Sequence, residues 1–307
     1  MKADPSATPP SPHALLNLHD GDSRVALCPG LGATIAQYRW RDHDILRPAP
    51  DGAVTAGLVR QMACYPLVPY SNRIGFAELR FGGARIRLRA NAPPEPHALH
   101  GFGWQRAWQV LAHDATTVEM QLRHRPDEDW PFPCEASYRV ELRNGGLHLR
   151  LAVRNCGEGA MPAGLGLHPF FPLDADTALE AHWGSMWPLD QNKLPTTVVP
   201  TPAEADFRKL RAVGRWQVDN CFCEWDGRAM LVYSTHRVFL QADNTCSRIV
   251  CYAPGDERRF IALEPVTHVS NAFAFAARGV AGTGMRILAP GASVELSLSI
   301  TPQGVDR

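Results

Sequence analysis

Strict alternation of apolar and polar residues, in segments spread through the chain, constrains its fold most strongly. Residues 147–154 read Leu-His-Leu-Arg-Leu-Ala-Val-Arg, and residues 85–89 read Arg-Ile-Arg-Leu-Arg. Apolar side chains also occupy every second position of residues 118–122 and 294–300. A period of two places these side chains on one face of a β-strand. The pattern therefore predicts strands with one face in a core and the other in water or a groove.

Two turn sequences connect such strands into predicted hairpins. Gly82-Gly83 interrupts one pair of alternating segments, and Asn144-Gly145-Gly146 interrupts another. Glycine and asparagine adopt the positive φ that tight hairpin turns require. Helical patterns are weak, and only residues 201–213 are predicted to hold one or two short turns. No glycine-rich motif has the spacing of a nucleotide-binding loop.

The 307 residues are enough for one large β-domain or two smaller ones. No linker-like stretch or internal repeat divides the chain. We therefore expect a disordered tail at residues 1–14 and a single domain at residues 15–307. The predicted fold is all-β, a large antiparallel β-sandwich or a related architecture.

Composition narrows the classes of function. Lys plus Arg and Asp plus Glu both total 31, so no net charge favours nucleic acid or an anionic membrane as a partner. No apolar run reaches the roughly 18 residues of a spanning helix. The eight cysteines are scattered and no signal-peptide pattern precedes them, which predicts mostly reduced thiols in a cytoplasmic protein. Cys221-Phe222-Cys223 lacks the second pair of ligands that a zinc site needs.

Glu264 is the carboxylate that most needs an explanation. It follows the apolar residues 260–263, which are typical of a buried strand, and precedes Pro265. Proline is expected to end the strand or to restrict it to a sheet edge. A carboxylate at the end of a buried strand is costly without a partner. Glu264 therefore has either a structural partner or a role in proton transfer.

Histidines supply a second group of candidates. His97 and His100 are three residues apart, and Gly residues follow His100. His168 follows an apolar run and precedes Pro-Phe-Phe, and its imidazole can exchange a proton near neutral pH. One interpretation is that His97, His100, His168 and Glu264 bind a metal ion. Another is that one histidine acts on a ligand beside Trp104, and a third is that each is an ordinary loop or core histidine.

Two further positions carry polar groups suited to ligand binding. Arg73 follows Asn72 at a junction between a loop and a strand, where a guanidinium can present a fixed set of donors. It can equally pair with a nearby carboxylate. Asp219 can accept hydrogen bonds from the hydroxyls of a polyol, or it can form a turn.

Together these segments resemble the aldose 1-epimerase (galactose mutarotase) family, over about residues 23–301. The resemblance rests on six segments in order: residues 29–33, residues 65–74, Leu99-His100-Gly101, Leu167-His168-Pro169-Phe170-Phe171, Asp219-Asn220 and Leu263-Glu264-Pro265. It implies a galactose mutarotase-like β-supersandwich fold. It also implies a reaction that uses no metal and no cofactor.

The resemblance also implies roles for individual residues. Glu264 would be the base that removes the proton from the C1 hydroxyl of a free sugar. His168 would be the acid that protonates the ring oxygen as the C1–O5 bond breaks. Substrate-binding roles are implied for Asn72, Arg73, His100 and Asp219. Two such proton-transfer groups typically accelerate a reaction by roughly 10²–10⁴-fold each.

Departures from the galactose-specific members point to a divergent bacterial branch. His168 is followed by Pro-Phe-Phe, where those members have Asn before the histidine and Ser-Tyr after it, and Glu264 is followed by Pro-Val-Thr-His. Alternative functions are a hexose-6-phosphate mutarotase, a non-catalytic carbohydrate-binding sandwich, and a metal-dependent sugar isomerase or lyase. Arg73, Arg80 and Lys193 are the candidates for binding a phosphate, although they form no compact basic cluster. The expected partner is a small sugar, and the expected assembly is a monomer or homodimer.

Overall fold

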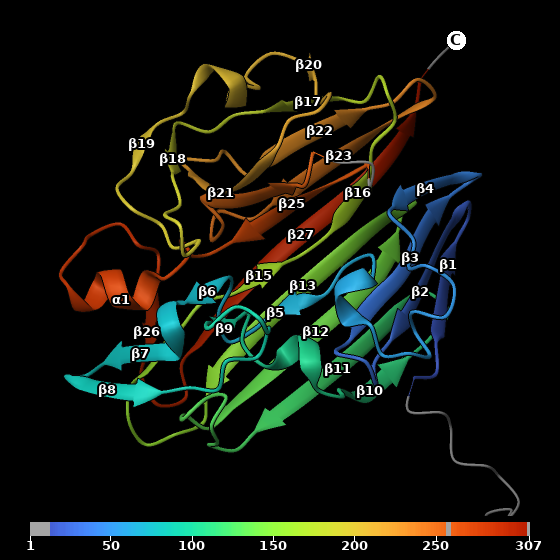
Figure 1. Ribbon diagram of the computed structural model, residues 1–307. Coiled ribbons are helices and arrows are strands. Elements are labelled where there is room, and N and C mark those ends of the chain that lie inside the picture. The colour runs from blue at the N-terminus through green and yellow to red at the C-terminus, as the bar shows by residue number, and fades with distance from the viewer. Residues whose placement is uncertain (1–12, 256–258, 306–307) are drawn as a thin grey trace, which may run out of the picture.

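The computed structural model describes residues 13–255 and 259–305. Within these residues the paired strands are antiparallel and form three larger sheets and three two-stranded ones, apart from isolated bridges (Figure 1). This confirms the predicted all-β antiparallel sandwich. Residues 1–12 of the predicted disordered tail lie outside the described residues.

The largest sheet has nine strands and runs diagonally through the molecule in Figure 1. Its spatial order is β10 (Gln109–His113), β11 (Thr117–His124), β12 (Cys134–Arg143), β13 (Gly146–Asn155), β27 (Ser293–Gly304), β23 (His236–Ala242), β22 (Arg228–Val232), β17 (Ala178–Ala181) and β20 (Arg211–Ala212). Three of the four alternating segments belong to this nine-stranded sheet, and residues 85–89 do not.

The eight-stranded sheet carries much of the candidate site. Its order is β19 (Val199–Pro200), β18 (Ser185–Trp187), β21 (Val218–Cys223), β24 (Arg248–Ala253), β25 (Phe260–Val266), β15 (Gly166–Leu167) and β5 (Pro66–Leu67), with β16 (Phe170–Pro172) also paired to β25. The remaining strands are β1 (Leu16–Asp20), β2 (Ser23–Cys28), β3 (Thr34–Trp40) and β4 (His43–Leu46) in one sheet, and the pairs β6 (Arg73–Ile74) with β9 (Ala98–Leu99), β7 (Glu78–Phe81) with β8 (Ala84–Arg87), and β14 (Met161–Ala163) with β26 (Arg286–Leu288).

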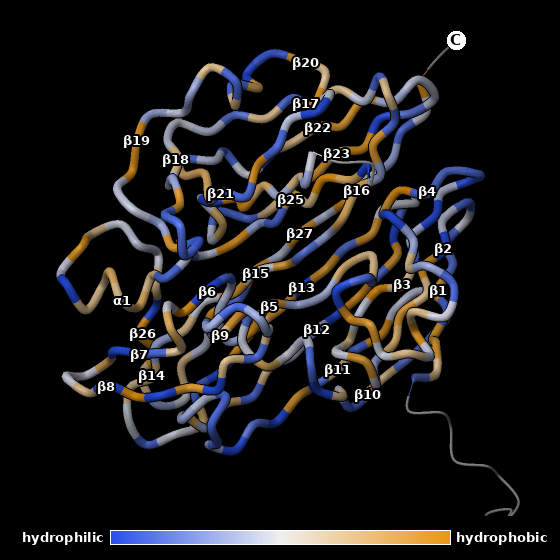
Figure 2. The backbone as a smooth tube through the Cα atoms, viewed as in Figure 1, coloured by the Kyte–Doolittle hydropathy of each residue, from blue (hydrophilic) through white to orange (hydrophobic). Residues whose placement is uncertain are grey.

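Both predicted hairpins are confirmed. Gly82 and Gly83 connect β7 to β8 with φ of 59° and 81°, and Asn144 and Gly145 connect β12 to β13 with φ of 52° and 74°. Two successive residues of positive φ match the twist of the flanking strands. Figure 2 shows the alternation along the strands as short hydrophobic and hydrophilic stretches.

Helices are short, as the weak helical patterns predict. The described residues contain one α-helix, α1 (Ala272–Ala277), which the sequence pattern did not predict. The 3₁₀ turns are η1 (Val59–Gln61), η2 (Gly75–Ala77), η3 (Gly103–Gln105) and η4 (Ala203–Ala205). The last of these lies where short turns were expected, within residues 201–213. None of these helices has the length and hydrophobicity to cross a membrane.

All eight cysteines are free thiols, in agreement with the prediction of reduced cysteines. Six of them are buried, Cys223 is partly exposed, and Cys156 is exposed. Burial raises the pKa of the Cys64 thiol, which makes it a poor nucleophile. Most of these thiols therefore serve as small apolar core residues.

Alternation along β25 divides its side chains between two faces. Ile261 and Leu263 join the main core, which also contains leucines of β13, β23 and β27. Phe260 and Ala262 belong to a second apolar cluster on the other face. Glu264 has the same parity as these two residues, so it points away from the main core.

Pro265 neither ends β25 nor places it at a sheet edge, so that expectation was wrong. The strand continues to Val266 and lies between β24 on one side and β15 and β16 on the other. β15 pairs with β25 at Val266, whereas β16 pairs with it from Ala262, which leaves a break in the ladder between them. A residue without an N–H is tolerated where no ladder bond is required. The connection across this break contains His168 and Pro169.

Gly164 supports the segment that follows β25, and its replacement by alanine should destabilise the protein. A Cβ at this position would lie 1.8 Å from Cδ2 of His268. The imidazole cannot swing away freely, because Nε2 accepts the Ser71 N–H at 3.0 Å and Nδ1 donates to the Val269 carbonyl at 2.8 Å. We expect Gly164→Ala to lower the free energy of unfolding by about 1–3 kcal/mol, the usual cost of overpacking.

Thermal or denaturant unfolding measures this effect directly. Gly159→Ala is the matched control, because no atom lies within 4 Å of a Cβ at that nearby glycine. The control should change stability by less than about 0.5 kcal/mol. Equal stability of the two variants would contradict the proposed packing of Gly164 against His268.

Candidate active site

A cavity of about 520 Å³ lies at the β25 face opposite the main core. This volume is in the range of about 300–1,000 Å³ usual for small-molecule sites. The six residues predicted from the sequence all line it: Asn72, Arg73, His100, His168, Asp219 and Glu264. The fold therefore brings together residues from five separate segments of the chain.

His168 and Glu264 form the innermost pair of the cavity. His168 Nε2 lies 3.2 Å from Glu264 Oε1, and the two side chains are 7% and 2% exposed. Among the described residues, neither His168 Nδ1 nor Glu264 Oε2 has a hydrogen-bond partner. A buried polar atom without a partner is costly, and such atoms beside a cavity are suited to bind a polar ligand.

His168 lies in the break between β15 and β16, where its side chain contacts Glu264. The His168 N–H donates to the Tyr65 carbonyl at 3.0 Å, which fixes the backbone beyond the end of β15. The imidazole stacks on the Phe170 ring, with centroids 4.3 Å apart and planes 21° apart. The Tyr65 ring lies on the same imidazole at 4.7 Å. Two aromatic rings therefore hold the orientation of His168.

Burial displaces the proton affinities of this pair in opposite directions. It raises the pKa of Glu264 well above the usual value, and the negative charge of Asp219 adds to this while Arg73 opposes it. It lowers the pKa of His168 well below the usual value, and His100 and Arg47 add to this. Both shifts favour the neutral forms, because a charged group loses hydration on burial. Burial therefore favours the form of the pair in which Glu264 holds a proton and His168 is neutral.

His100 is fixed by two reciprocal hydrogen bonds with Asn72. The His100 N–H donates to the Asn72 carbonyl at 2.9 Å, and the Asn72 N–H donates to His100 Nδ1 at 3.0 Å. Because Nδ1 accepts, the neutral ring carries its proton on Nε2. Burial and then the charge of Arg73 lower the pKa of His100 to about 3. His100 is therefore a neutral hydrogen-bond donor in the wall of the cavity.

Arg73 presents its guanidinium to the opposite polar wall. Nη1 donates to Asn72 Oδ1 at 3.3 Å, and Nη2 lies 3.5 Å from Asp219 Oδ2. Nε donates to Glu95 Oε2 at 2.9 Å. Asn72 Oδ1 also accepts from Ser270 Oγ at 2.8 Å, so this atom is occupied by the protein. Arg73 thus both pairs with carboxylates and lines the cavity.

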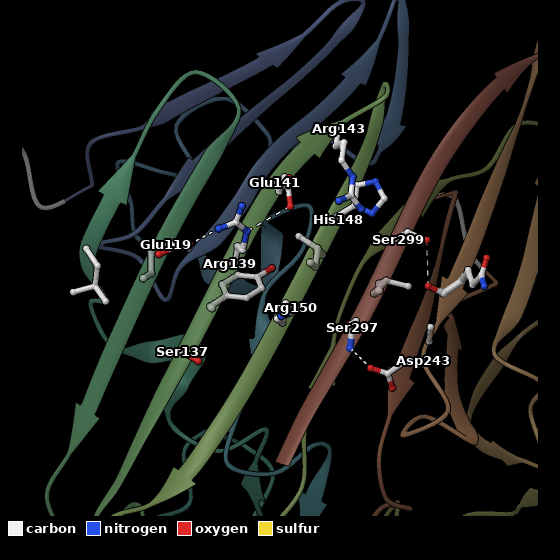
Figure 3. Close-up of a pocket in the computed structure, with 17 residues that line it drawn as sticks. Glu119, Ser137, Arg139, Glu141, Arg143, His148, Arg150, Asp243, Ser297 and Ser299 are labelled. Atoms are coloured by element: carbon white, nitrogen blue, oxygen red, sulfur yellow. Dashed lines mark hydrogen bonds and ion pairs between the residues drawn. The ribbon is translucent and has the colours of Figure 1, made fainter. Parts of the chain in front are cut away.

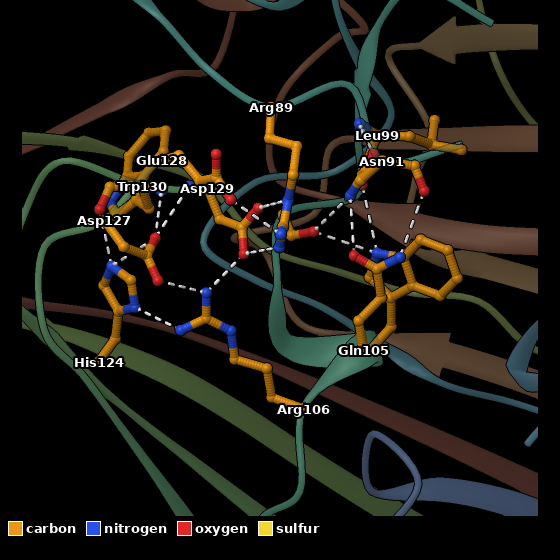
Figure 4. A network of polar contacts seen from close by, with 12 residues as sticks. Arg89, Asn91, Leu99, Gln105, Arg106, His124, Asp127, Glu128, Asp129 and Trp130 are labelled. Atoms are coloured by element: carbon orange, nitrogen blue, oxygen red, sulfur yellow. Dashed lines mark hydrogen bonds and ion pairs between the residues drawn. The ribbon is translucent and has the colours of Figure 1, made fainter. Parts of the chain in front are cut away.

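A polar network that includes Asn91 and Leu99 holds the segment next to His100 (Figure 4). The Asn91 side chain accepts the Leu99 N–H at 2.7 Å and donates to the Leu99 and Gly101 carbonyls, on either side of His100. In the same network, Arg89 makes two hydrogen bonds to the buried carboxylate of Asp129, at 2.8 and 2.6 Å. These bonds hold the backbone on either side of His100, whose own φ is 60°.

Sequence reasoning missed several residues of the cavity wall. Glu95 and the aromatic residues Tyr65, Phe170, Tyr252 and Phe260 line it but were not predicted as site residues. Phe170 lies two residues from His168, so its position in the motif was a signal. Glu95 carried no signal except its place between two prolines. Trp104, which was considered as a platform, lines the cavity as well.

His97 does not belong to the cavity. Its Nδ1 accepts the Phe76 N–H at 2.8 Å, and its Nε2 donates to the Asn192 carbonyl at 2.9 Å. Both ring nitrogens are therefore used by the backbone, and the four-residue metal set of His97, His100, His168 and Glu264 is not assembled. Within the described parts of the chain, no three His, Cys, Asp or Glu side chains are grouped as a metal site.

A larger groove of about 860 Å³ lies on the open face of the nine-stranded sheet (Figure 3). Several of its charged side chains are bound by the sheet itself: Arg139 pairs with Glu119 and Glu141, and Asp243 accepts the Ser297 N–H at 2.6 Å. Its walls are partly exposed strand faces, without a buried acid–base pair. Chemistry therefore favours the smaller cavity as the functional site.

Comparisons with known proteins agree with this fold and assign a family. The family model described as aldose 1-epimerase matches residues 14–301. The uncharacterized protein YphB of Escherichia coli K12 is 27% identical over 271 residues, which are 85% of this chain and 90% of that protein.

Two solved structures show the same fold. A galactose mutarotase-like protein from Clostridium acetobutylicum has a TM-score of 0.83 at 18% identity and covers 95% of each chain. An aldose epimerase homologue from C. elegans has a TM-score of 0.79 at 18% identity, over 95% of this chain and 99% of that one. The expected galactose mutarotase-like fold is confirmed.

Proposed function

Because the chain belongs to the aldose 1-epimerase family, we propose that it interconverts the α and β anomers of a free aldose by opening and closing the sugar ring. The observation that supports this best is the buried His168–Glu264 pair, with its 3.2 Å contact and one unpartnered polar atom on each side chain. Ring opening needs a base at the C1 hydroxyl and an acid at the ring oxygen. Both of these atoms are bonded to C1, so two adjacent side chains can reach them together.

In the proposed mechanism the two side chains exchange protons with the sugar. The Glu264 carboxylate takes the proton of the C1 hydroxyl, and the His168 imidazolium gives a proton to O5 as the C1–O5 bond breaks. The aldehyde then rotates about C1–C2. On closure, protonated Glu264 returns a proton to the carbonyl oxygen and neutral His168 takes the proton from the O5 hydroxyl.

The protonation states favoured by burial fit this cycle. Neutral Glu264 with neutral His168 is the pair needed for closure, and the ion pair is the form needed for opening. The two forms contain the same number of protons, and a transfer across the contact between the side chains interconverts them. No exchange with solvent is required during the reaction.

The rest of the cavity supplies binding groups. The Nε2–H of His100 is proposed to donate near C1 or the ring oxygen. Asn72, Arg73 and Asp219 are proposed to bind hydroxyls, and the aromatic wall gives an apolar surface for the carbon face of the ring. The free thiols fit a reducing compartment, and we propose the cytoplasm.

The phosphate-binding alternative receives little support from the residues named for it. Arg80 donates to Glu78 at 2.7 Å on the β7–β8 hairpin and does not line the cavity. Arg73 and Lys193 do line it, but both pair with the carboxylate of Glu95, and Arg73 also pairs with Asp219. The two named cations that line the cavity are thus already paired with carboxylates, and we propose a free sugar as the substrate.

Saturation-transfer NMR of anomer exchange on a panel of free aldoses and their 6-phosphates tests the proposal. We expect at least one free aldose to exchange faster than in buffer alone, and faster than its 6-phosphate. Binding of sugars without faster exchange would support the non-catalytic alternative. Acceleration of the 6-phosphates alone would favour the phosphate branch.

A further inference from the structure

Glu95 is a charged residue of the cavity wall that the mechanism does not use. Its carboxylate accepts two hydrogen bonds from Arg73, at 2.9 Å from Nε and 3.3 Å from Nη2. It also accepts one from Lys193 Nζ at 2.7 Å. Glu95 is 22% exposed and Arg73 only 8%, so the Arg73 pair is shielded from water. A two-point contact of this kind fixes the plane of a guanidinium.

The backbone around Glu95 is restrained before any substrate arrives. Proline precedes it and follows it, and a residue before proline is confined to extended conformations. The Glu95 N–H donates to the Ala92 carbonyl at 3.1 Å. The loop therefore restrains the backbone from which the Glu95 carboxylate reaches Arg73.

Lys193 reaches Glu95 from a tight turn at residues 190–194, between β18 and β19. Asp190 Oδ1 accepts the N–H groups of Asn192 and Leu194, and Lys193 has φ of 57°. His97, two residues after Glu95, donates to the Asn192 carbonyl. The Glu95 segment thus binds this turn at two points and brings Lys193 to the mouth of the cavity.

We propose that Glu95 is a positioning residue that orients Arg73 for substrate binding. Through its ion pair with Lys193, Glu95 also holds the turn at residues 190–194 at the cavity, where Lys193 contributes to the choice of substrate. This inference rests on the proposed function for its effect on catalysis. Nε and Nη2 are committed to carboxylates, and one N–H of Nη1 donates to Asn72 Oδ1, so the second N–H of Nη1 is the donor left for a substrate. The paired charges hold the pKa of Glu95 at about 2, because the hydrogen bonds from Arg73 and Lys193 outweigh the effect of burial. The Glu95 carboxylate is therefore ionised at every physiological pH.

Kinetics of Glu95→Gln test this role. We expect KM to rise about 10- to 100-fold, as for the loss of hydrogen bonds to a charged group, with kcat changed less than about threefold. Lys193→Met should raise KM about two- to fivefold, because its ion pair is more exposed. The double variant should be no worse than Glu95→Gln, since both changes act through one carboxylate.

Glu78→Gln is the matched control. Glu78 is 28% exposed and pairs with Arg80 and Arg85, but it lies outside the cavity. It should leave both KM and kcat unchanged. A KM for Glu95→Gln within twofold of the wild-type value, or a loss of kcat at unchanged KM, would overturn the inference.

A second measurement does not depend on activity. The Nε–H signal of Arg73 in ¹⁵N NMR should be shifted and slow to exchange in the wild-type protein, and should lose its protection in Glu95→Gln. An unchanged signal in that variant overturns the positioning role. If the wild-type protein accelerates no sugar, the proposed function fails, and the Arg73 signal still decides whether Glu95 positions Arg73.

Discussion

Replacing Glu264 with glutamine should slow anomer exchange by roughly 10²–10⁴-fold, the usual contribution of one positioned proton-transfer group. The amide has nearly the shape of the neutral carboxyl group but cannot take the C1 hydroxyl proton. Burial already favours the uncharged form of Glu264. Stability should therefore change little while the rate falls steeply.

This combination separates a catalytic role from a structural one. Saturation-transfer NMR gives the rate, and thermal unfolding gives the stability. Glu180→Gln, at an exposed position of β17, is the control and should match the wild-type protein in both. Activity of Glu264→Gln within about tenfold of wild type would remove Glu264 from the mechanism.

Replacing His168 with glutamine should cause a loss of similar size, roughly 10²–10⁴-fold, and should also change the pH profile. Below the depressed pKa of His168 the pair holds two protons and has no base. Above the raised pKa of Glu264 it holds none and has no acid. The wild-type kcat/KM should therefore show a broad plateau, because the single-proton state persists between these two limits.

The two limbs belong to the coupled pair, and each single variant leaves one of its groups to titrate alone. On the acid side, kcat/KM should fall about tenfold per pH unit below the His168 pKa. His168→Gln keeps only the base Glu264, so it should lose the alkaline limb and keep an acid limb at the raised pKa of Glu264. Glu264→Gln keeps only the acid His168, so it should lose the acid limb and keep an alkaline limb at the depressed pKa of His168. Other groups near His168 are Tyr65, His100, Arg47 and Arg60, and the pKa of His100, about 3, lies far from neutrality. Survival of both limbs in His168→Gln would contradict the assignment.

Several features of the fold could be predicted from the sequence, because they depend on residues that are close together in the chain. The turn at Asn144 and Gly145 needs only positive φ, and the alternation of residues 147–154 needs only one buried face. The six predicted cavity residues were found because each lies in a short family-like segment. Their placement in one cavity followed from the fold.

Other features depend on contacts that no local pattern encodes. Pro265 was expected to end a strand, yet it lies within β25 because the partner ladder is broken opposite it. Glu95 joins Lys193 across 98 residues of sequence, and Arg73 meets Asp219 across 146. His97 looked like a possible partner of His100, but it faces a different turn.

Periodicity and turn chemistry thus determined the strands, the hairpins and the antiparallel class, since each follows from backbone geometry within a few residues. The tertiary structure alone decided that Glu264 meets His168 as a buried pair, and burial shifts the pKa values of both. It alone also joined Glu95 to Arg73. Burial and charge proximity arise only when distant segments pack together, so these properties had no signature in the local sequence.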